Sequence, residues 1–261
     1  MTVEVDVEVQ DPISLAEFRS RVISKVDPSE PESLSAIARD LAALASDKQL
    51  MVRKIAADLA GWRSPEFSMY SAQSCILDRF GPFTVRANLW PSVVVSEGEE
   101  KALSYHAYHD HNFSFATVNL YGPGYKTDVY ERVGGGAMCN VGDSVDLVHL
   151  GEQQLSPGKV VLYRKGVDVH AQIPPSSPSA SINLILSGDD LPFLDQYYFD
   201  PSREMVVGMV ENVVAKRLSV ISLGKFIGST RSLESLASIS SSFPCVRTRE
   251  AAAKLVAHLN H

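Results

Sequence analysis

The chain has 261 residues, of which 45% are hydrophobic, enough for a sizeable core in one or two domains. Its 24 basic and 31 acidic residues give a formal net charge of −7, and no basic cluster offsets this charge, so binding to nucleic acid is not expected. No apolar run reaches the length of a membrane span, and the acidic start MTVEVDVEVQDP does not resemble a signal peptide. The scattered Cys75, Cys139 and Cys245 are predicted to be free thiols. These features predict a cytoplasmic protein that does not bind membranes.

Residues 1–68 are predicted to form an N-terminal helical segment that packs on the rest of the protein. Within residues 13–62, apolar side chains recur three and four positions apart, which is the spacing of one helix face. The Pro and Ser residues at the beginning of DPSEPESLSAIARDLAALASD are typical of a helix start, and Gly61 is typical of a helix end.

Residues 69–190 are predicted to form a β domain. From about Tyr70 the chain consists of short runs rich in β-branched and aromatic residues, such as FTVRANLW, FSFATVNLY, KVVLYRK and SASINLIL. Turn sequences such as GP, GPG, GGG and SPG separate these runs. Many short strands at even spacing indicate a barrel or a sandwich of two sheets.

Residues 191–261 are predicted to form a C-terminal helical extension. Apolar residues in this part return to helical spacing: Val206, Met209, Val210, Val213 and Val214. A segment this apolar is expected to be an integral layer of the protein. It is predicted either to cover the mouth of the barrel or to form the contact of a homodimer, and the sequence leaves both possibilities open.

The stretch SYHAYHDHNFSFATVNLYGPG contains the pair His109 and His111. Residues two apart on a strand point to the same face, so the two imidazoles reach one point, whereas His106 would face away on an unbroken strand. A third ligand is available in LSPGKVVLYRKGVDVH, where His170 lies on a strand that returns after two turns. The pattern therefore predicts a metal site. The alternatives are exposed imidazoles on a sheet edge and histidines that are hydrogen-bonded in a core.

The two histidine segments resemble the two signatures of the cupin superfamily, whose fold is a double-sheet jelly-roll barrel. Within this superfamily, YSAQSCILDRFGPFTVRANLWP, HDHNFSFATVNLYGPGYKTDVYE and DVHAQ followed by SINLILSG are similar to the cysteine dioxygenase-like thiol dioxygenases. The resemblance covers roughly residues 69–190. It implies a mainly β fold, a cupin barrel flanked by the two helical segments.

The resemblance also implies that His109, His111 and His170 are the ligands of a mononuclear iron(II). The glutamate that many cupins place after the second histidine is missing here, which implies a neutral site with three histidines. Two departures from the thiol dioxygenases matter for the substrate. Ala72 stands where these enzymes have an arginine that holds the substrate carboxylate, and Ile185 stands where they have a tyrosine. Free cysteine is therefore not the expected substrate.

Other side chains are predicted to complete the site. Arg79 or Arg86 can hold a carboxylate through two parallel hydrogen bonds, although a surface charge is the alternative for each. Asn183 is predicted to act in catalysis, because a buried amide needs a partner such as a substrate or a ligand histidine. The predicted substrate-binding set, which assumes regular strands without a bulge, is Arg79, Arg86, Gln73, Tyr105 and Tyr121.

The sequence thus predicts an iron(II)-dependent oxygenase that acts on O₂ and a small molecule, such as an amino-acid or thiol derivative. Three neutral imidazoles on one side of an ion leave its other positions open for such chemistry. A second possibility is a cupin isomerase or lyase with Zn, Mn or Ni. A third is a cupin that binds a ligand without catalysis.

Overall fold

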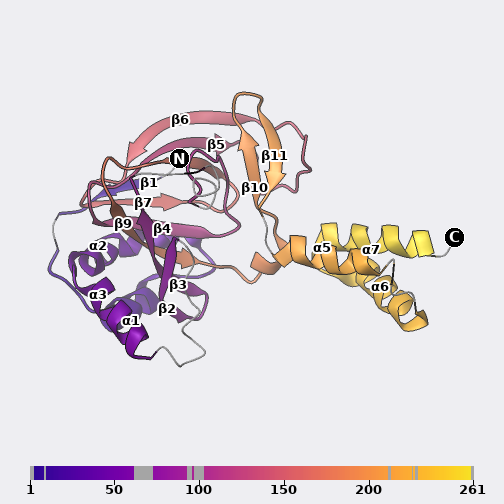
Figure 1. The fold of residues 1–261 in the computed structure, drawn as a ribbon, viewed down its shortest axis with the longest axis horizontal. Coiled ribbons are helices and arrows are strands. Elements are labelled where there is room, and N and C mark those ends of the chain that lie inside the picture. Colours follow the sequence, from indigo (N-terminus) through magenta and orange to yellow (C-terminus); the bar gives the residue numbers. More distant parts are fainter. Residues whose placement is uncertain are drawn as a thin grey trace.

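The computed structural model of the protein describes residues 3–8, 10–61, 73–92, 96, 103–210, 213–224, 226 and 229–259. A barrel of antiparallel strands forms its centre (Figure 1). The N-terminal helices lie against one side of the barrel, and the C-terminal helices extend away from it as an arm. None of the described helices is long and apolar enough to cross a membrane.

The N-terminal segment is helical, as predicted, except for a first strand that joins the barrel. Its elements are β1 (Val3–Asp6), α1 (Leu15–Lys25), the 3₁₀ helix η1 (Pro31–Ile37), α2 (Ala38–Ser46) and α3 (Leu50–Ala60). Helix α1 begins at Ser14, whose hydroxyl accepts a hydrogen bond from the Glu17 backbone N–H at 3.1 Å, a typical N-terminal cap. Strand β1 pairs with a barrel strand, so this segment is part of the barrel as well as a cover for it.

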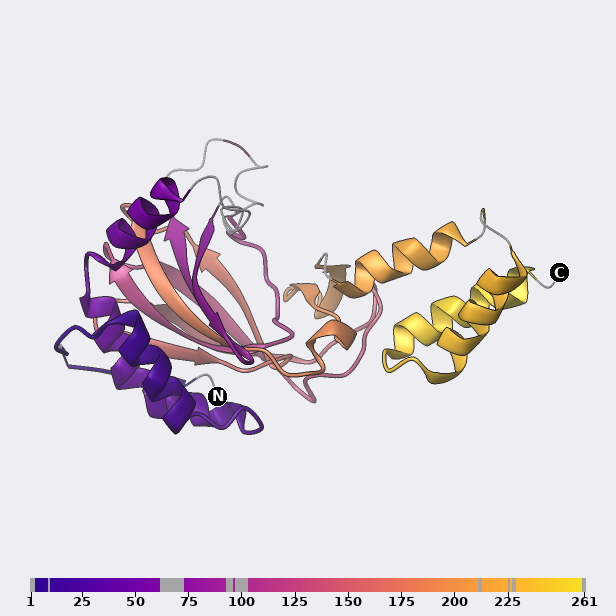
Figure 2. The ribbon, with the colours of Figure 1, turned by 90° about the horizontal axis from the view of Figure 1, so that it is seen from below.

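Six strands form the larger sheet in the order β1-β7-β4-β9-β3-β2, and every neighbouring pair is antiparallel. The strands after β1 are β2 (Ser74–Phe80), β3 (Phe83–Trp90), β4 (Ser114–Tyr121), β7 (Lys159–Tyr163) and β9 (Ser179–Leu186). This sheet forms the wall that the N-terminal helices cover (Figure 2).

Strands β4 and β9 are buried along almost their whole length because both faces of the large sheet are covered. Ala116 and Val118 on β4 belong to the cluster that contains Leu41 of α2. Phe115, the neighbour of Ala116 on β4, belongs to a second cluster, which lies inside the barrel and also contains Tyr163. This explains why SASINLIL reads as an unbroken apolar run rather than as an alternating strand.

The second sheet has the order β6-β5-β8, with β5 (Lys126–Arg132), β6 (Leu147–Gln154) and β8 (Asp168–Ile173). A hairpin of β10 (Tyr197–Asp200) and β11 (Met205–Met209) extends this sheet, since His109 bridges to His170 on one side and to Tyr198 on the other. The double-sheet barrel predicted from the sequence is therefore present.

The hairpin corrects the prediction that residues 191–261 are wholly helical. Val206 and Met209 lie in β11, where Val206 is buried and Val207 is exposed, which is the two-residue alternation of a strand. The helical part consists of the short 3₁₀ helix η3 (Leu191–Phe193), α5 (Val213–Leu223), α6 (Thr230–Ser242) and α7 (Val246–Leu259). The arm points away from the barrel rather than across it (Figure 1). The dimer contact stays a prediction.

Two arginines fix the arm to the barrel. Arg247 on α7 forms an ion pair with Asp195 at 2.7 Å and donates a further hydrogen bond to the carbonyl of Cys139. Arg217 on α5 donates to the carbonyl of Pro192 at 3.0 Å. The side chains of Arg247 and Asp195 are only 14% and 5% exposed, so this ion pair is largely shielded from water.

Replacing Arg247 with methionine should lower the free energy of unfolding by about 3 kcal/mol, because the buried Asp195 carboxylate loses its positively charged partner and keeps only the hydrogen bond from the Tyr197 hydroxyl at 3.0 Å. Arg203→Met is the matched control. Arg203 is also paired with an aspartate, Asp200 at 3.5 Å, but it is 72% exposed. Its loss should change stability by less than about 0.5 kcal/mol. Urea denaturation of both variants checks this, and equal losses would contradict it.

Candidate metal centre

The segment that carries the first two histidines is not the unbroken strand that the sequence predicts. Ser104 and His106 have positive φ angles of 57° and 55°, which turn the backbone sharply before the histidine pair. The chain then runs between β8 and β10, held by reciprocal backbone hydrogen bonds of 3.0 Å between His109 and His170. His106 is exposed, so its predicted absence from the site rests on this turn and not on strand alternation.

The structure brings the three predicted ligands together. One ring nitrogen of each of His109, His111 and His170 lies within 4.8 Å of the others. The ring centroids are 4.9 Å apart for His109 and His111, 4.8 Å for His109 and His170, and 5.1 Å for His111 and His170. Glu131, an acidic residue further along the chain, is not part of this cluster and is paired with Arg164 at 2.8 Å.

The hydrogen bonds of the rings define which nitrogen faces the centre. His109 Nδ1 lies 2.8 Å from the carbonyl of Ala107 and therefore carries a proton, which leaves Nε2 as a lone-pair donor. His111 Nδ1 lies 3.2 Å from the Gln196 amide, whose oxygen can accept from it once the amide is turned over. Both ring nitrogens of His170 are buried without a hydrogen-bond partner among the described residues. An ion at the centre would satisfy this orphaned imidazole, so the donor set fits a divalent metal.

Burial keeps all three imidazoles neutral. It lowers the pKa of His109, and it lowers the pKa values of His111 and His170 well below their usual range, with mutual repulsion among the rings adding to the effect. Arg86 lines the same cavity as His109 and His111, and its positive charge also lowers the pKa values of these two residues. Neutral imidazole is the form that binds metals.

Asp110, between the two histidines, is a structural anchor. Its carboxylate accepts a hydrogen bond from the Tyr197 backbone N–H at 2.7 Å and lies 3.8 Å from Arg132. Burial raises the pKa of Asp110 to about 6. This side chain is not a member of the histidine cluster, and it ties the histidine segment to the β10–β11 hairpin.

A polar cavity of about 150 Å³ opens beside the cluster and is lined by His109 and His111. Three of the side chains predicted for the site, Arg86, Gln73 and Asn183, line it as well. Asn183 is buried, and its side-chain oxygen accepts a hydrogen bond of 2.7 Å from Thr117. The predicted catalytic role of Asn183 stays a prediction.

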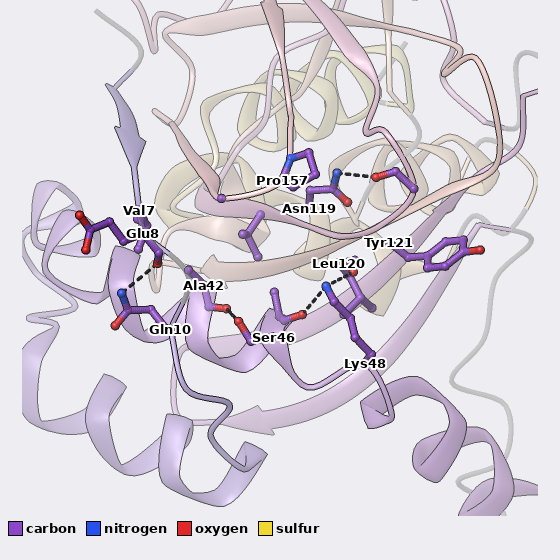
Figure 3. A pocket seen from close by; sticks show the side chains of 14 residues that line it. Val7, Glu8, Gln10, Ala42, Ser46, Lys48, Asn119, Leu120, Tyr121 and Pro157 are labelled. Carbon is purple, nitrogen blue, oxygen red and sulfur yellow. Dashed lines mark hydrogen bonds between the residues drawn. The ribbon is translucent and has the colours of Figure 1, made fainter.

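The other three predicted side chains lie outside this cavity. Arg79 is exposed near the β2–β3 turn. Tyr121 is 68% exposed and borders a different hollow, between α2 and the end of β4, where Lys48 donates to the carbonyl of Leu120 (Figure 3). Tyr105 is buried, but its hydroxyl donates to the carbonyl of Pro91 at 2.7 Å. The structure therefore does not place these three side chains in the cavity beside the histidines, as the sequence had predicted. Ala72 lies outside the described residues.

Several cavity residues were not predicted. Tyr125 follows the GPG turn and packs against Trp90 with ring centroids 4.2 Å apart. Gln196 and Tyr198 come from the β10 end of the hairpin, and the Tyr198 ring lies 6.2 Å from that of His109. The sequence marks Tyr125 by its place after a turn, but it contains no signal for the other two, because their position depends on the bridge from Tyr198 to His109.

Gln196 should matter for metal affinity through its contact with His111. Gln196→Ala should weaken metal binding about 10- to 100-fold, because partners that orient a ligand histidine have effects of this size. Gln196→Glu should keep most of the affinity, since its carboxylate still accepts from Nδ1–H. A competition titration against a chelator measures both variants, and an equal loss in the two would contradict a positioning role.

No known protein-family profile and no curated protein matches the chain. Among solved structures it is similar to a DMSP lyase from Ruegeria pomeroyi, with 14% identity, 48% of this chain covered and a TM-score of 0.28. It is also similar to a hydroquinone 1,2-dioxygenase in complex with Cd²⁺ and 4-hydroxybenzonitrile (10% identity, 47% of this chain and 69% of that chain, TM-score 0.29). A sugar phosphate isomerase of the cupin superfamily from Silicibacter pomeroyi gives 17% identity, 46% of this chain, 58% of that chain and a TM-score of 0.27. The chain spans 54% of the lyase, about half its length.

The fold is a cupin barrel. This assignment rests on the two antiparallel sheets of the chain itself. The three solved proteins carry out different reactions, so the likeness to them does not indicate which reaction this chain catalyses.

Proposed function

We propose that the protein is a mononuclear non-haem iron(II) oxygenase of the three-histidine cupin type that acts on a small molecule. One observation carries the proposal. Three neutral imidazoles, two of them buried and the third, that of His111, partly buried, converge on one point, and the nitrogens of His170 have no partner among the described residues. Such a cluster on the wall of a polar cavity fits an ion that is held from one side and meets its reactants from the other.

Different residues of this chain would bind the metal, orient its ligands and position the substrate. His109, His111 and His170 would hold the ion, with Ala107 and Gln196 fixing the orientation of two rings. Bound iron(II) would supply the electrons for chemistry with O₂. The cavity would position the substrate through Arg86 and through the hydroxyl of Tyr125, whose pKa burial raises to about 12, so that it stays a hydrogen-bond donor.

Metal analysis of protein purified without oxygen, followed by oxygen uptake against a panel of small molecules, tests the proposal. About one iron per chain and substrate-dependent oxygen uptake are expected. A different divalent metal without oxygen uptake would instead indicate an isomerase or lyase. A metal content near zero after anaerobic reconstitution would contradict the proposal and would favour a cupin that binds a ligand without catalysis.

Free L-cysteine should be a poor substrate. Ile185 stands at the position where the thiol dioxygenases that the chain resembles have a tyrosine. It packs in the apolar barrel cluster with Phe115 and has no hydroxyl group. Mass spectrometry of the products should show little cysteine sulfinate from protein that carries its full metal load. Efficient conversion to cysteine sulfinate would contradict this prediction.

A further inference from the structure

Arg86 lines the cavity as a cation that has no counter-ion among the described residues. It lies on β3 opposite Asn183 of β9. Its Nε is buried without a hydrogen-bond partner in the described part of the chain, and burial lowers the pKa of Arg86. An arginine keeps its proton in such a place, so its charge needs an anion.

Among the described residues, no acidic side chain lines the cavity around Arg86. The lining consists of neutral polar and aromatic residues and one valine, together with Arg86 and the two histidines. The imidazoles are neutral, and a divalent ion among them would add positive charge. A cationic group on a ligand would therefore find no carboxylate among these residues and would be repelled by Arg86.

Two amides supply the remaining unused polar atoms. Asn88 Oδ1 and Gln172 Oε1 are buried without partners among the described residues, and both side chains line the cavity. Asn88 and Gln172 are only 5% and 6% exposed, so these oxygens are not hydrogen-bonded to bulk water. An amide can present its oxygen or its NH₂ group, and a hydroxyl group, which both donates and accepts, complements either orientation.

The cavity is also small. Its volume of about 150 Å³ is well under the roughly 300 Å³ at which sites for drug-sized ligands begin. The ligand must therefore combine its anionic group and its hydroxyl groups on a skeleton of a few heavy atoms.

We propose that this cavity selects a small hydroxycarboxylate and rejects the matching α-amino acid. The carboxylate pairs with Arg86, and hydroxyl groups pair with Asn88 and Gln172. The inference rests on the proposed function, because it concerns the same cavity, and it names the substrate class of that site. It narrows the expectation from the sequence, which includes amino-acid derivatives.

Calorimetric titration with a matched set of three-carbon ligands tests the proposal. Glycerate carries the carboxylate and two hydroxyls, serine replaces one hydroxyl with an ammonium, propionate lacks the hydroxyls, and glycerol lacks the charge. Both enantiomers of glycerate and serine are titrated into metal-free protein and into protein loaded with redox-inert zinc. Glycerate should bind at least about tenfold more tightly than any of the other three.

Two variants identify the group responsible. Arg86→Gln should lose at least about tenfold in glycerate affinity, and its melting temperature should not fall, because the substitution removes a partly buried charge that has no counter-ion among the described residues. Arg79→Gln, on the neighbouring strand and outside the cavity, should bind glycerate like the unmodified protein. Circular dichroism confirms that both variants are folded.

The proposal is overturned if serine binds as tightly as glycerate in either form of the protein, or if none of the four ligands binds. It is equally overturned if Arg79→Gln loses as much affinity as Arg86→Gln. These outcomes are separate from those of the proposed function, which depends on the identity of the metal and on oxygen uptake. An iron oxygenase that prefers serine would contradict only the substrate class.

Discussion

Alanine in place of His109, His111 or His170 should remove most of the bound metal and all activity. Each of these imidazoles contributes one of three nitrogens that lie within 4.8 Å of one another, and two ligands hold a divalent ion far less well than three. The loss of affinity should exceed the roughly 100-fold that is typical when only a supporting partner is removed. Metal content after dialysis, measured by mass spectrometry, gives the result for each variant.

His106→Ala is the control for these three variants. His106 comes from the same short segment, but it is exposed and lies on the far side of a backbone turn. This variant should keep its metal and lose only some stability. Loss of metal in His106→Ala, with retention in His109→Ala or His111→Ala, would show that the three-histidine centre is assigned to the wrong residues.

The cluster of three histidines was predictable because each member carries a recognisable signal. His109 and His111 are two residues apart, and His170 follows a Pro-Gly turn and a strand, which is the order of the two cupin signatures that the chain resembles. The barrel was predictable for a similar reason, since its strands are short and separated by Gly and Pro. The β10–β11 hairpin was not, because a run such as MVVGMV fits a strand and a helix equally well. Its pairing with the His109 segment decides the matter.

The substrate side of the site was harder to predict because it depends on register. The register between β4 and β9 shifts between Asn119 and Tyr121, and such a bulge breaks the alternation that was expected to place Tyr121 inside the barrel. Arg79 and Arg86 both lie in the β2–β3 hairpin. Arg79 lies close to its turn, opposite Thr84, whereas Arg86 lies further along β3, where the barrel cavity begins. No local pattern distinguishes these two arginines.

Gly124→Ala should be among the most destabilising single substitutions in the barrel. Gly124 has a φ of +79°, and a Cβ at this position would lie 1.7 Å from the carbonyl oxygen of Leu155. Hydrogen bonds hold both backbones at this close approach. The Gly124 N–H donates to the Ser179 hydroxyl at 3.1 Å, and the Leu155 N–H donates to the carbonyl of Tyr125 at 2.9 Å. Neither backbone can move without breaking a hydrogen bond and shifting Tyr125, which lines the cavity. We expect a loss of about 4 kcal/mol or more in the free energy of unfolding.

Gly81→Ala isolates the effect of this close approach from the effect of the backbone angle. Gly81 also has a positive φ, +51°, but a Cβ there would meet nothing within 4 Å. Its substitution should therefore cost only the roughly 1–2 kcal/mol of placing an L-residue in the left-handed region. Chemical denaturation of the two variants gives the comparison, and equal losses would mean that the backbone at Leu155 moves aside at little cost. A larger loss in Gly124→Ala, accompanied by weaker ligand binding, would instead show that the turn after β4 holds Tyr125 in the cavity, and that only glycine lets this turn approach the Leu155 backbone so closely.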